Sequence, residues 1–166
     1  MFKIIGLSRS NINQITQVDF ECEHQLERKR KFESYKKELI ERFNKKQEMF
    51  FGFVEGRELK GYVTLKPFFP GHKHCEAYWI AVKKKYQSRG IGKELMRFIE
   101  NYAKKKGFRK IFLYTNEKMK GVRRFYENLG YKLINKFPGY YGFPKDNTAV
   151  LYGKTIGKMC DRVRFP

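Results

Sequence analysis

EAYWIAVKKKYQSRGIG, residues 76–92, is the stretch that decides the fold. The apolar run over residues 75–82 is rich in aromatic and β-branched residues, which predicts a strand. A basic turn follows, and from Gly90 the apolar residues recur at helical spacing, which predicts a helix that ends at Gly107. A strand, a glycine turn and a helix in this order place main-chain amides at a helix N-terminus, where phosphate oxygens bind.

Two common phosphate-binding patterns do not fit this turn. The Walker pattern needs a Gly-Lys-Ser/Thr ending, which the chain lacks. The dinucleotide fingerprint needs a third glycine at the position of Leu95. The spacing that remains is a glutamine, two residues, Gly90, one residue and Gly92, so the turn points to a different phosphate-bearing ligand.

This spacing resembles the pyrophosphate-binding motif of the GNAT N-acetyltransferase superfamily. A second stretch, RRFYENLGY at residues 123–131, is similar to the FYxxxGF motif of the same family, and the two motifs occur in the family's order. The resemblance covers residues 75–134 closely and the rest of the chain by the order of its elements. It implies an α/β fold (mixed α+β) of the GNAT type, in which a mostly antiparallel twisted sheet is splayed at the cofactor strand and flanked by about four helices.

The resemblance also implies acetyl-CoA as the co-substrate. In the family, pantetheine pairs with the end of the cofactor strand, and the amides of the glycine turn hold the pyrophosphate with help from basic side chains. Many members have Asn seven residues before the motif tyrosine, where this chain has Met119. The implied cofactor-binding residues are Ile80, Ala81, Val82, Gln87, Ser88, Arg89, Gly90, Ile91, Gly92, Lys93 and, in place of the missing Asn, Asn116.

Acetyl transfer to an amine requires that the amine lose a proton and that the departing thiolate gain one. Glu76 lies eleven residues before Gln87, the offset at which histone-acetylating members carry their glutamate, and is the candidate base. The alternative is a strand glutamate paired with a surface lysine. Tyr126 corresponds to the family tyrosine that protonates the thiolate; the alternative is a packed aromatic residue with a satisfied hydroxyl.

The acceptor is less well specified. An aromatic loop over residues 137–144 resembles the place where protein N-terminal acetyltransferases carry paired tyrosines, which makes Tyr140 and Tyr141 candidate substrate contacts; an ordinary aromatic turn is the alternative. The 37 Lys and Arg residues against 17 Asp and Glu residues give a formal charge of +20. This charge disfavours polyamine acceptors and favours protein or peptide amines, small acidic amines, or an acidic or polyanionic partner.

The same charge leaves two further interpretations open. One is a lysine-rich solvated surface spread over the whole molecule. The other is a GNAT-fold module with little or no transferase activity that binds nucleic acid or the ribosome, with a helix over residues 26–47 docking phosphates on its basic face. His72, His74 and Cys75 crowd a proline-rich region without a second ligand pair, so we expect no metal.

Length and composition predict a single domain over residues 1–166. No apolar run approaches the roughly 20 residues of a membrane-spanning helix, so we expect a soluble cytoplasmic protein without membrane partners. Three widely spaced cysteines favour reduced thiols. A monomer and a homodimer both remain open. Beyond the stretch that decides the fold, the periodicity predicts strands over 2–7, 50–54, 59–65, 111–114, 131–134 and 148–152, and helices through 12–18, 26–47 and 117–129.

Overall fold

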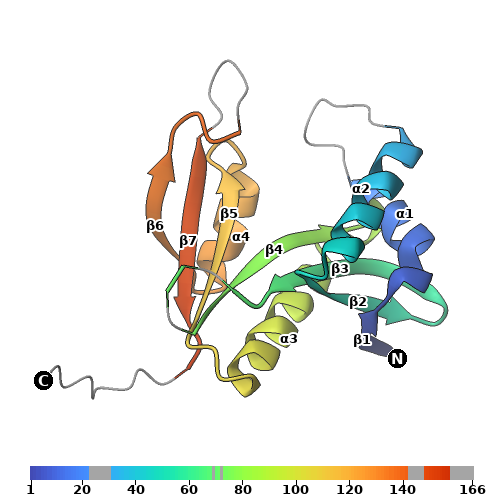
Figure 1. Cartoon of the computed structure of the whole chain (residues 1–166), viewed down its shortest axis with the longest axis horizontal. Coiled ribbons are helices and arrows are strands. Elements are labelled where there is room, and N and C mark those ends of the chain that lie inside the picture. The colour runs from blue at the N-terminus through green and yellow to red at the C-terminus, as the bar shows by residue number, and fades with distance from the viewer. Residues whose placement is uncertain (23–30, 69, 72, 142–147, 158–166) are drawn as a thin grey trace, which may run out of the picture. The chain divides into compact units, whose positions relative to one another are not determined.

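The structure is a computed structural model that describes residues 1–22, 31–68, 70–71, 73–141 and 148–157. Its strands form one sheet in the order β1-β2-β3-β4-β5-β7-β6. The mixed α/β class expected from the sequence is confirmed (Figure 1). The elements are β1 (Phe2–Leu7), α1 (Ile12–Cys22), α2 (Phe32–Lys45), β2 (Met49–Glu55), β3 (Glu58–Lys66), β4 (His74–Val82), α3 (Ile91–Lys105), β5 (Lys110–Asn116), α4 (Lys120–Asn128), β6 (Lys132–Phe137) and β7 (Ala149–Thr155), with 3-10 turns η1 (Arg9–Asn11) and η2 (Lys84–Tyr86).

The chain divides into two compact units. Unit 1 comprises Met1–Pro67 and Ala77–Ile99, and unit 2 comprises Phe68–Glu76 and Glu100–Pro166. Strand β4 and helix α3 therefore contribute residues to both units. The single domain expected over residues 1–166 stays a prediction.

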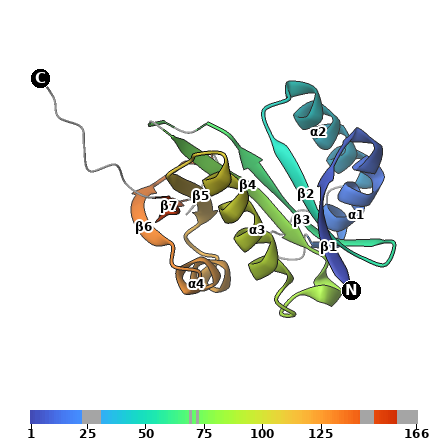
Figure 2. The same ribbon diagram turned by 90° about the horizontal axis from the view of Figure 1, so that it is seen from below.

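Unit 1 is built on three antiparallel strands. β1 pairs with β2, and β2 pairs with β3 through a hairpin whose turn contains Gly56 at a φ of 61°. Because alternate strand residues face the same side, one side of these strands is apolar, and α1 packs on it and on α2 (Figures 1 and 2). The core between them consists of Ile15, Val18, Leu39, Phe50, Leu59, Tyr62 and Ala81.

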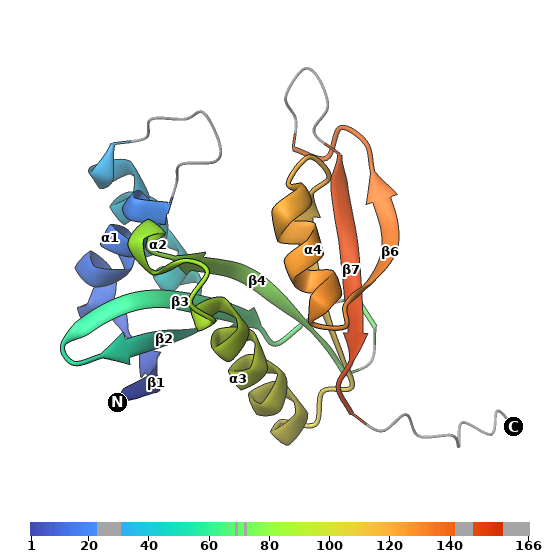
Figure 3. The same ribbon diagram turned by 180° about the vertical axis from the view of Figure 1, so that it is seen from behind.

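Unit 2 centres on β5, β7 and β6, which pair antiparallel in that order. The first residues of β4, His74–Glu76, pair in parallel with Lys110–Phe112 of β5. Helix α4 lies against this sheet, with Arg123 bonded to the hydroxyl of Tyr152 on β7 (Figure 3). The last turn of α3 ends as the sequence predicts, because Gly107 adopts a φ of 85°.

Two predicted helices differ from the observed ones at their starts. The helix expected from Glu117 begins only at Lys120, because the side-chain oxygen of Asn116 accepts a hydrogen bond from the Lys118 amide and holds a turn. The helix expected over 26–47 appears as α2 from Phe32, and residues 26–30 lie outside the described residues. The other predicted strands and helices are confirmed, with ends that differ by a few residues.

A buried polar cluster lies within unit 1. The Asp19 carboxylate, on α1, is 5% exposed and accepts hydrogen bonds from the Tyr62 hydroxyl (2.7 and 2.8 Å) and the Trp79 indole nitrogen (3.0 Å). Burial raises the pKa of Asp19 from 3.8 to about 6, although both hydrogen bonds lower it. The desolvation of the carboxylate therefore outweighs its hydrogen bonds.

We predict that Asp19 makes the protein less stable as the pH rises. The folded state holds the Asp19 proton between pH 4 and 6, where the unfolded chain has lost it, so this group favours folding below pH 4 and loses that contribution as the pH passes 6. A shift of about 2 pKa units corresponds to at most about 3 kcal/mol. The free energy of unfolding in urea, measured between pH 4 and 7, should fall less for Asp19→Asn than for the wild type. An equal fall for the two proteins would contradict the prediction.

Candidate functional site

The turn that joins β4 to α3 has the backbone of an anion-binding loop. Ser88 has a φ of 59° and Gly90 a φ of 83°, and the Gly90 carbonyl accepts the first hydrogen bond of α3, from the Glu94 amide at 3.0 Å. Left-handed residues at alternate positions make successive amides converge. The amides of the first helical turn have no partner within the helix, so they add to this concave set.

The loop is open to solvent on the side that a phosphate would approach. Residues 87–90 are exposed, and a Cβ atom on Gly90 would meet no atom within 4 Å. Arg89 and Lys93 lie in or next to the loop, and within the described part of the chain neither makes an ion pair. The exposed amides and two cations fit the diphosphate of a coenzyme A molecule.

The side chain of Gln87 makes a contact within the protein. Its side-chain nitrogen donates a hydrogen bond to the Val82 carbonyl at 3.0 Å, which ties the start of the turn to the end of β4. The Gln87 side chain therefore shapes the loop, and the Val82 carbonyl has a partner within the protein. Ile80 and Ala81, the other two residues expected to pair with pantetheine, do not take part in this hydrogen bond.

A carboxylate that the sequence analysis did not identify contacts the residues that precede the loop. Glu58, at the start of β3, accepts hydrogen bonds from the Tyr86 hydroxyl (2.6 Å) and the Lys83 ammonium (3.0 Å), and pairs with Lys85 at 3.1 Å. These partners, led by the Tyr86 hydroxyl, lower the pKa of Glu58 to about 2. Tyr86 stands in the basic run before the loop, a position whose structural role no periodicity could reveal.

The ring of Tyr86 is also surrounded by cations. The Lys60 ammonium lies 4.3 Å from the ring centroid, that of Lys85 lies 4.8 Å away, and the Arg89 guanidinium carbon lies 5.6 Å away. Each contact is a favourable cation–π interaction at a partly exposed site. Tyr86 therefore links Glu58 to Arg89, which is one of the two cations of the phosphate loop.

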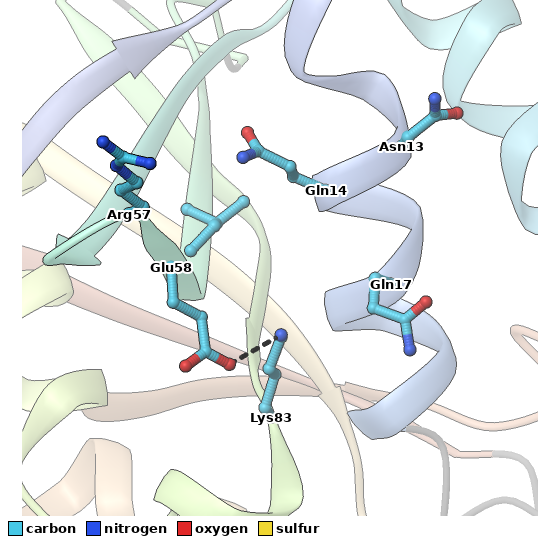
Figure 4. Close-up of a pocket in the computed structure, with 7 residues that line it drawn as sticks. Asn13, Gln14, Gln17, Arg57, Glu58 and Lys83 are labelled. Atoms are coloured by element: carbon cyan, nitrogen blue, oxygen red, sulfur yellow. Dashed lines mark hydrogen bonds and ion pairs between the residues drawn. The ribbon is translucent and has the colours of Figure 1, made fainter.

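A polar groove of about 510 Å³ lies on the α1 side of unit 1 (Figure 4). Figure 4 shows the ion pair between Glu58 and Lys83 at its edge. No residue of the expected cofactor or catalytic sets lines this groove. Its lining consists of Asn13, Gln14, Gln17, Arg57, Glu58, Leu59 and Lys83.

Unit 2 contains both candidate catalytic residues and both candidate acceptor contacts. Glu76 is the last β4 residue paired with β5, opposite Phe112. Tyr114, two residues further along β5, stacks on Tyr140 with the ring centroids 5.3 Å apart, and the charge of Glu76 adds to burial in raising the pKa of Tyr114. Tyr140 in turn meets Tyr141 edge-on at 5.2 Å. Tyr114 was absent from the sequence-based set, because only the fold brings it to this place.

Tyr126 is buried at 6% exposure on α4. Burial, with a smaller contribution from Tyr141, raises the pKa of Tyr126 well above its ordinary value. The rings of Tyr131 and Tyr152 lie 5.9 and 6.4 Å away. Tyr126 therefore keeps its proton at every pH at which the protein would work, and its hydroxyl can donate a hydrogen bond.

Asn116 has a structural contact that accounts for its place. Its side-chain oxygen accepts a hydrogen bond from the Lys118 amide at 2.9 Å, and its carbonyl accepts one from the Met119 amide at 3.1 Å. These bonds form the turn that precedes α4. The amide nitrogen of this side chain has no part in these two bonds and could donate to a cofactor.

The expectation of no metal is not tested by the structure. Among the described residues, no group of three His, Cys, Asp or Glu side chains could hold a metal ion, but His72 lies outside them. Cys75 is buried, and burial raises the pKa of its thiol to about 12, so it stays protonated.

No described helix combines the length and the apolar character that crossing a bilayer requires.

Comparison with known proteins identifies the family. The model of the acetyltransferase (GNAT) family matches residues 10–131, and the chain belongs to this family. The probable N-acetyltransferase 14 of Xenopus tropicalis is 38% identical over 76 residues, which are 46% of this chain and 36% of that protein. Protein SPT10 of Saccharomyces cerevisiae is 33% identical over 121 residues, 66% of this chain and 18% of its own length. The chain thus spans about a third and about a fifth of these two relatives.

Solved structures share the fold at low sequence identity. The ribosomal-protein-S18-alanine N-acetyltransferase of Escherichia coli superposes with a TM-score of 0.80 at 16% identity, covering 99% of this chain and all of the other. The PaiA N-acetyltransferase of Thermoplasma acidophilum, solved in complex with coenzyme A, superposes with a TM-score of 0.74 at 21% identity, covering 93% and 99% of the two chains. These likenesses confirm the expected GNAT fold.

We predict that Tyr86→Phe weakens coenzyme A binding about tenfold. The variant removes the hydrogen bond to Glu58, keeps the ring that the cations contact, and leaves the net charge unchanged. A hydrogen bond to a charged group contributes about 1.5 to 3 kcal/mol, and part of that energy keeps the loop in its binding conformation. Isothermal titration calorimetry with coenzyme A measures the loss. Tyr102→Phe on α3 is the matched control, and equal affinities for the two variants would contradict the prediction.

Proposed function

We propose that the chain is an acetyl-CoA-dependent N-acetyltransferase, an acyltransferase that moves the acetyl group from the thioester directly to a primary amine in a ternary complex. The observation that carries the proposal is the turn at Gly90, where two residues with a positive φ lie directly before the start of α3, a backbone typical of an anion site. Membership of the GNAT family and the solved relative in complex with coenzyme A support the same ligand.

The loop residues have distinct tasks in this proposal. The main-chain amides from Ser88 to Lys93 bind the diphosphate oxygens, and Arg89 and Lys93 supply the compensating charge. The Gln87 amide, which the sequence analysis included, already donates to the Lys84 carbonyl at 3.2 Å. Ile80 and Ala81 pair their main chain with the amides of pantetheine in the manner of an added strand. Val82 takes part in the same pairing, although its carbonyl also accepts a hydrogen bond from the Gln87 side chain. Bound acetyl-CoA supplies an acetyl group activated as a thioester.

Glu76 and Tyr126 carry the proton transfers in the proposal. Glu76 accepts the proton that an ammonium acceptor must lose before its nitrogen can attack, directly or through water. A tyrosine whose pKa lies well above 10 does not favour full proton transfer to a thiolate of pKa about 8.5. Tyr126 therefore stabilises the departing sulfur by donating a hydrogen bond, and the proton that Glu76 has accepted leaves through solvent.

We propose a protein or peptide amine, either an N-terminus or a lysine, as the acceptor, with a small amine as the alternative. Tyr140 is 54% exposed and Tyr141 is 37% exposed, so both offer aromatic surface to an incoming chain. The ring of Tyr114 stacks on the ring of Tyr140 and so supports it. The ribosomal-protein N-acetyltransferase of the same fold is consistent with this class of acceptor. Location in the cytoplasm, one domain over residues 1–166 and a monomeric or homodimeric state complete the proposal.

Gly90→Ala tests the cofactor loop. At a φ of 83° a β-carbon costs about 1 to 2 kcal/mol, which the loop can relieve only by turning its amides away from the ligand. We expect coenzyme A affinity to fall at least tenfold by calorimetry. Gly121→Ala, in α4 and in open space, is the matched control and should bind as the wild type does. The proposed function fails if folded wild-type protein gives no heat with coenzyme A.

Glu76→Gln tests the base. At neutral pH we expect kcat/KM for a peptide amine to fall about 100-fold, because the acceptor stays protonated, while coenzyme A affinity is unchanged. The deficit should shrink as the pH approaches the pKa of the amine, about 8 for an N-terminus, since the acceptor then deprotonates in solution. A deficit that is constant from pH 6 to 9 would remove Glu76 from this role.

A further inference from the structure

A dense basic surface lies in unit 2, where α3 ends and β5 begins. Residues 104–110 read KKKGFRK, with five cations in seven positions. The fold adds a sixth, because the Arg109 amide donates to the Lys73 carbonyl at 2.8 Å and β5 starts beside β4 at this point. The α3–β5 basic patch, as we call this surface, consists of Lys73, Lys104, Lys105, Lys106, Arg109 and Lys110.

Among the described residues, no acidic side chain is paired with the patch. No Asp or Glu occurs in the sequence between Glu100 and Glu117. Glu100, one turn before the patch, is already paired with Lys154 at 2.7 Å. Within the described part of the chain, none of the six cations makes an ion pair. Their mutual repulsion therefore opposes folding, and a bound polyanion would relieve it.

The helix dipole explains only part of this arrangement. Lysines in the last turn of a helix compensate the partial negative charge of its terminal carbonyls, which accounts for Lys104, Lys105 and Lys106. Lys73 precedes β4, and Arg109 and Lys110 lie at the start of β5, beyond the reach of that effect. A cluster assembled from a helix end and two strand starts is a surface produced by the tertiary fold.

We propose that the α3–β5 basic patch binds the phosphodiester backbone of a nucleic acid without regard to base sequence, an activity beyond acetyl transfer. Charge complementarity to a regularly spaced polyanion is the main argument. An acidic protein partner fits less well, because protein interfaces depend on apolar anchors. Among the described residues, none of the large exposed apolar side chains falls within residues 101–110.

Helix α2, which the sequence analysis offered as a site for phosphate docking, carries acidic as well as basic residues. Glu33, Glu38 and Glu41 alternate with its lysines, and Arg42 is buried in a pair with Glu48. The mixture of charges makes α2 a weak polyanion site. Lys37, Lys45 and Lys46 are as exposed as the lysines at the end of α3, and they provide a control of equal charge.

The test compares two triple variants by fluorescence anisotropy with a labelled single-stranded RNA of about 20 nucleotides over a series of salt concentrations. One variant carries Lys104→Gln, Lys105→Gln and Lys106→Gln, and the other carries Lys37→Gln, Lys45→Gln and Lys46→Gln. The patch variant should lose at least tenfold in affinity, and its slope of log K against log salt should fall by about 2. The α2 variant should stay within about threefold of the wild type.

Three outcomes would overturn the proposal. The wild type could fail to bind the RNA at low salt, the two variants could weaken equally, as a diffuse charge effect requires, or a polyglutamate peptide of the same length could bind the patch as tightly as the RNA. Thermal unfolding followed by circular dichroism on the same samples reports whether each variant is folded. Because this readout does not depend on coenzyme A, this proposal stays separate from the proposed transferase activity, and either can fail while the other holds.

Discussion

The rest of the proposed cofactor site depends on the left-handed turn of the backbone at Gly90. A residue with a φ of 83° between a strand and a helix reverses the chain so that the amides before and after it point outward together. The same residue gives α3 its first carbonyl acceptor, so the helix and the proposed anion site begin at one point. Glycine is favoured here because a β-carbon would strain this conformation.

A turn of this kind keeps its shape only if the flanking residues are fixed, and the protein fixes them from two sides. Gln87 ties the turn to the end of β4 through the Val82 carbonyl. Glu58, from the neighbouring hairpin, holds Tyr86 and Lys83. Because Glu58 is ionised down to a pH of about 2, these contacts persist over the whole range in which the protein would work.

Charge and burial act differently in different parts of the protein. Next to the proposed cofactor loop, the pKa shift of Glu58 comes mainly from its hydrogen-bonded partners. Around Tyr126 and Asp19 the shifts come first from burial, which favours the protonated form of each group. The cations of the loop can therefore bind an anion, whereas Tyr126 stays protonated and can donate a hydrogen bond.

The sequence by itself determined the fold class, the strand–turn–helix unit and the helix end at Gly107, since local periodicity and glycine conformation decide these features. It also marked Glu76, Tyr126, Tyr140 and Tyr141 as candidate site residues, and all four lie in unit 2. It could not find Glu58 or Tyr114, because their roles arise from contacts with residues distant in sequence. Nor could it separate the lysines of α2 from those at the end of α3. Only the tertiary structure decided which cations have acidic neighbours, because ion pairing depends on distance in space, which sequence spacing does not give.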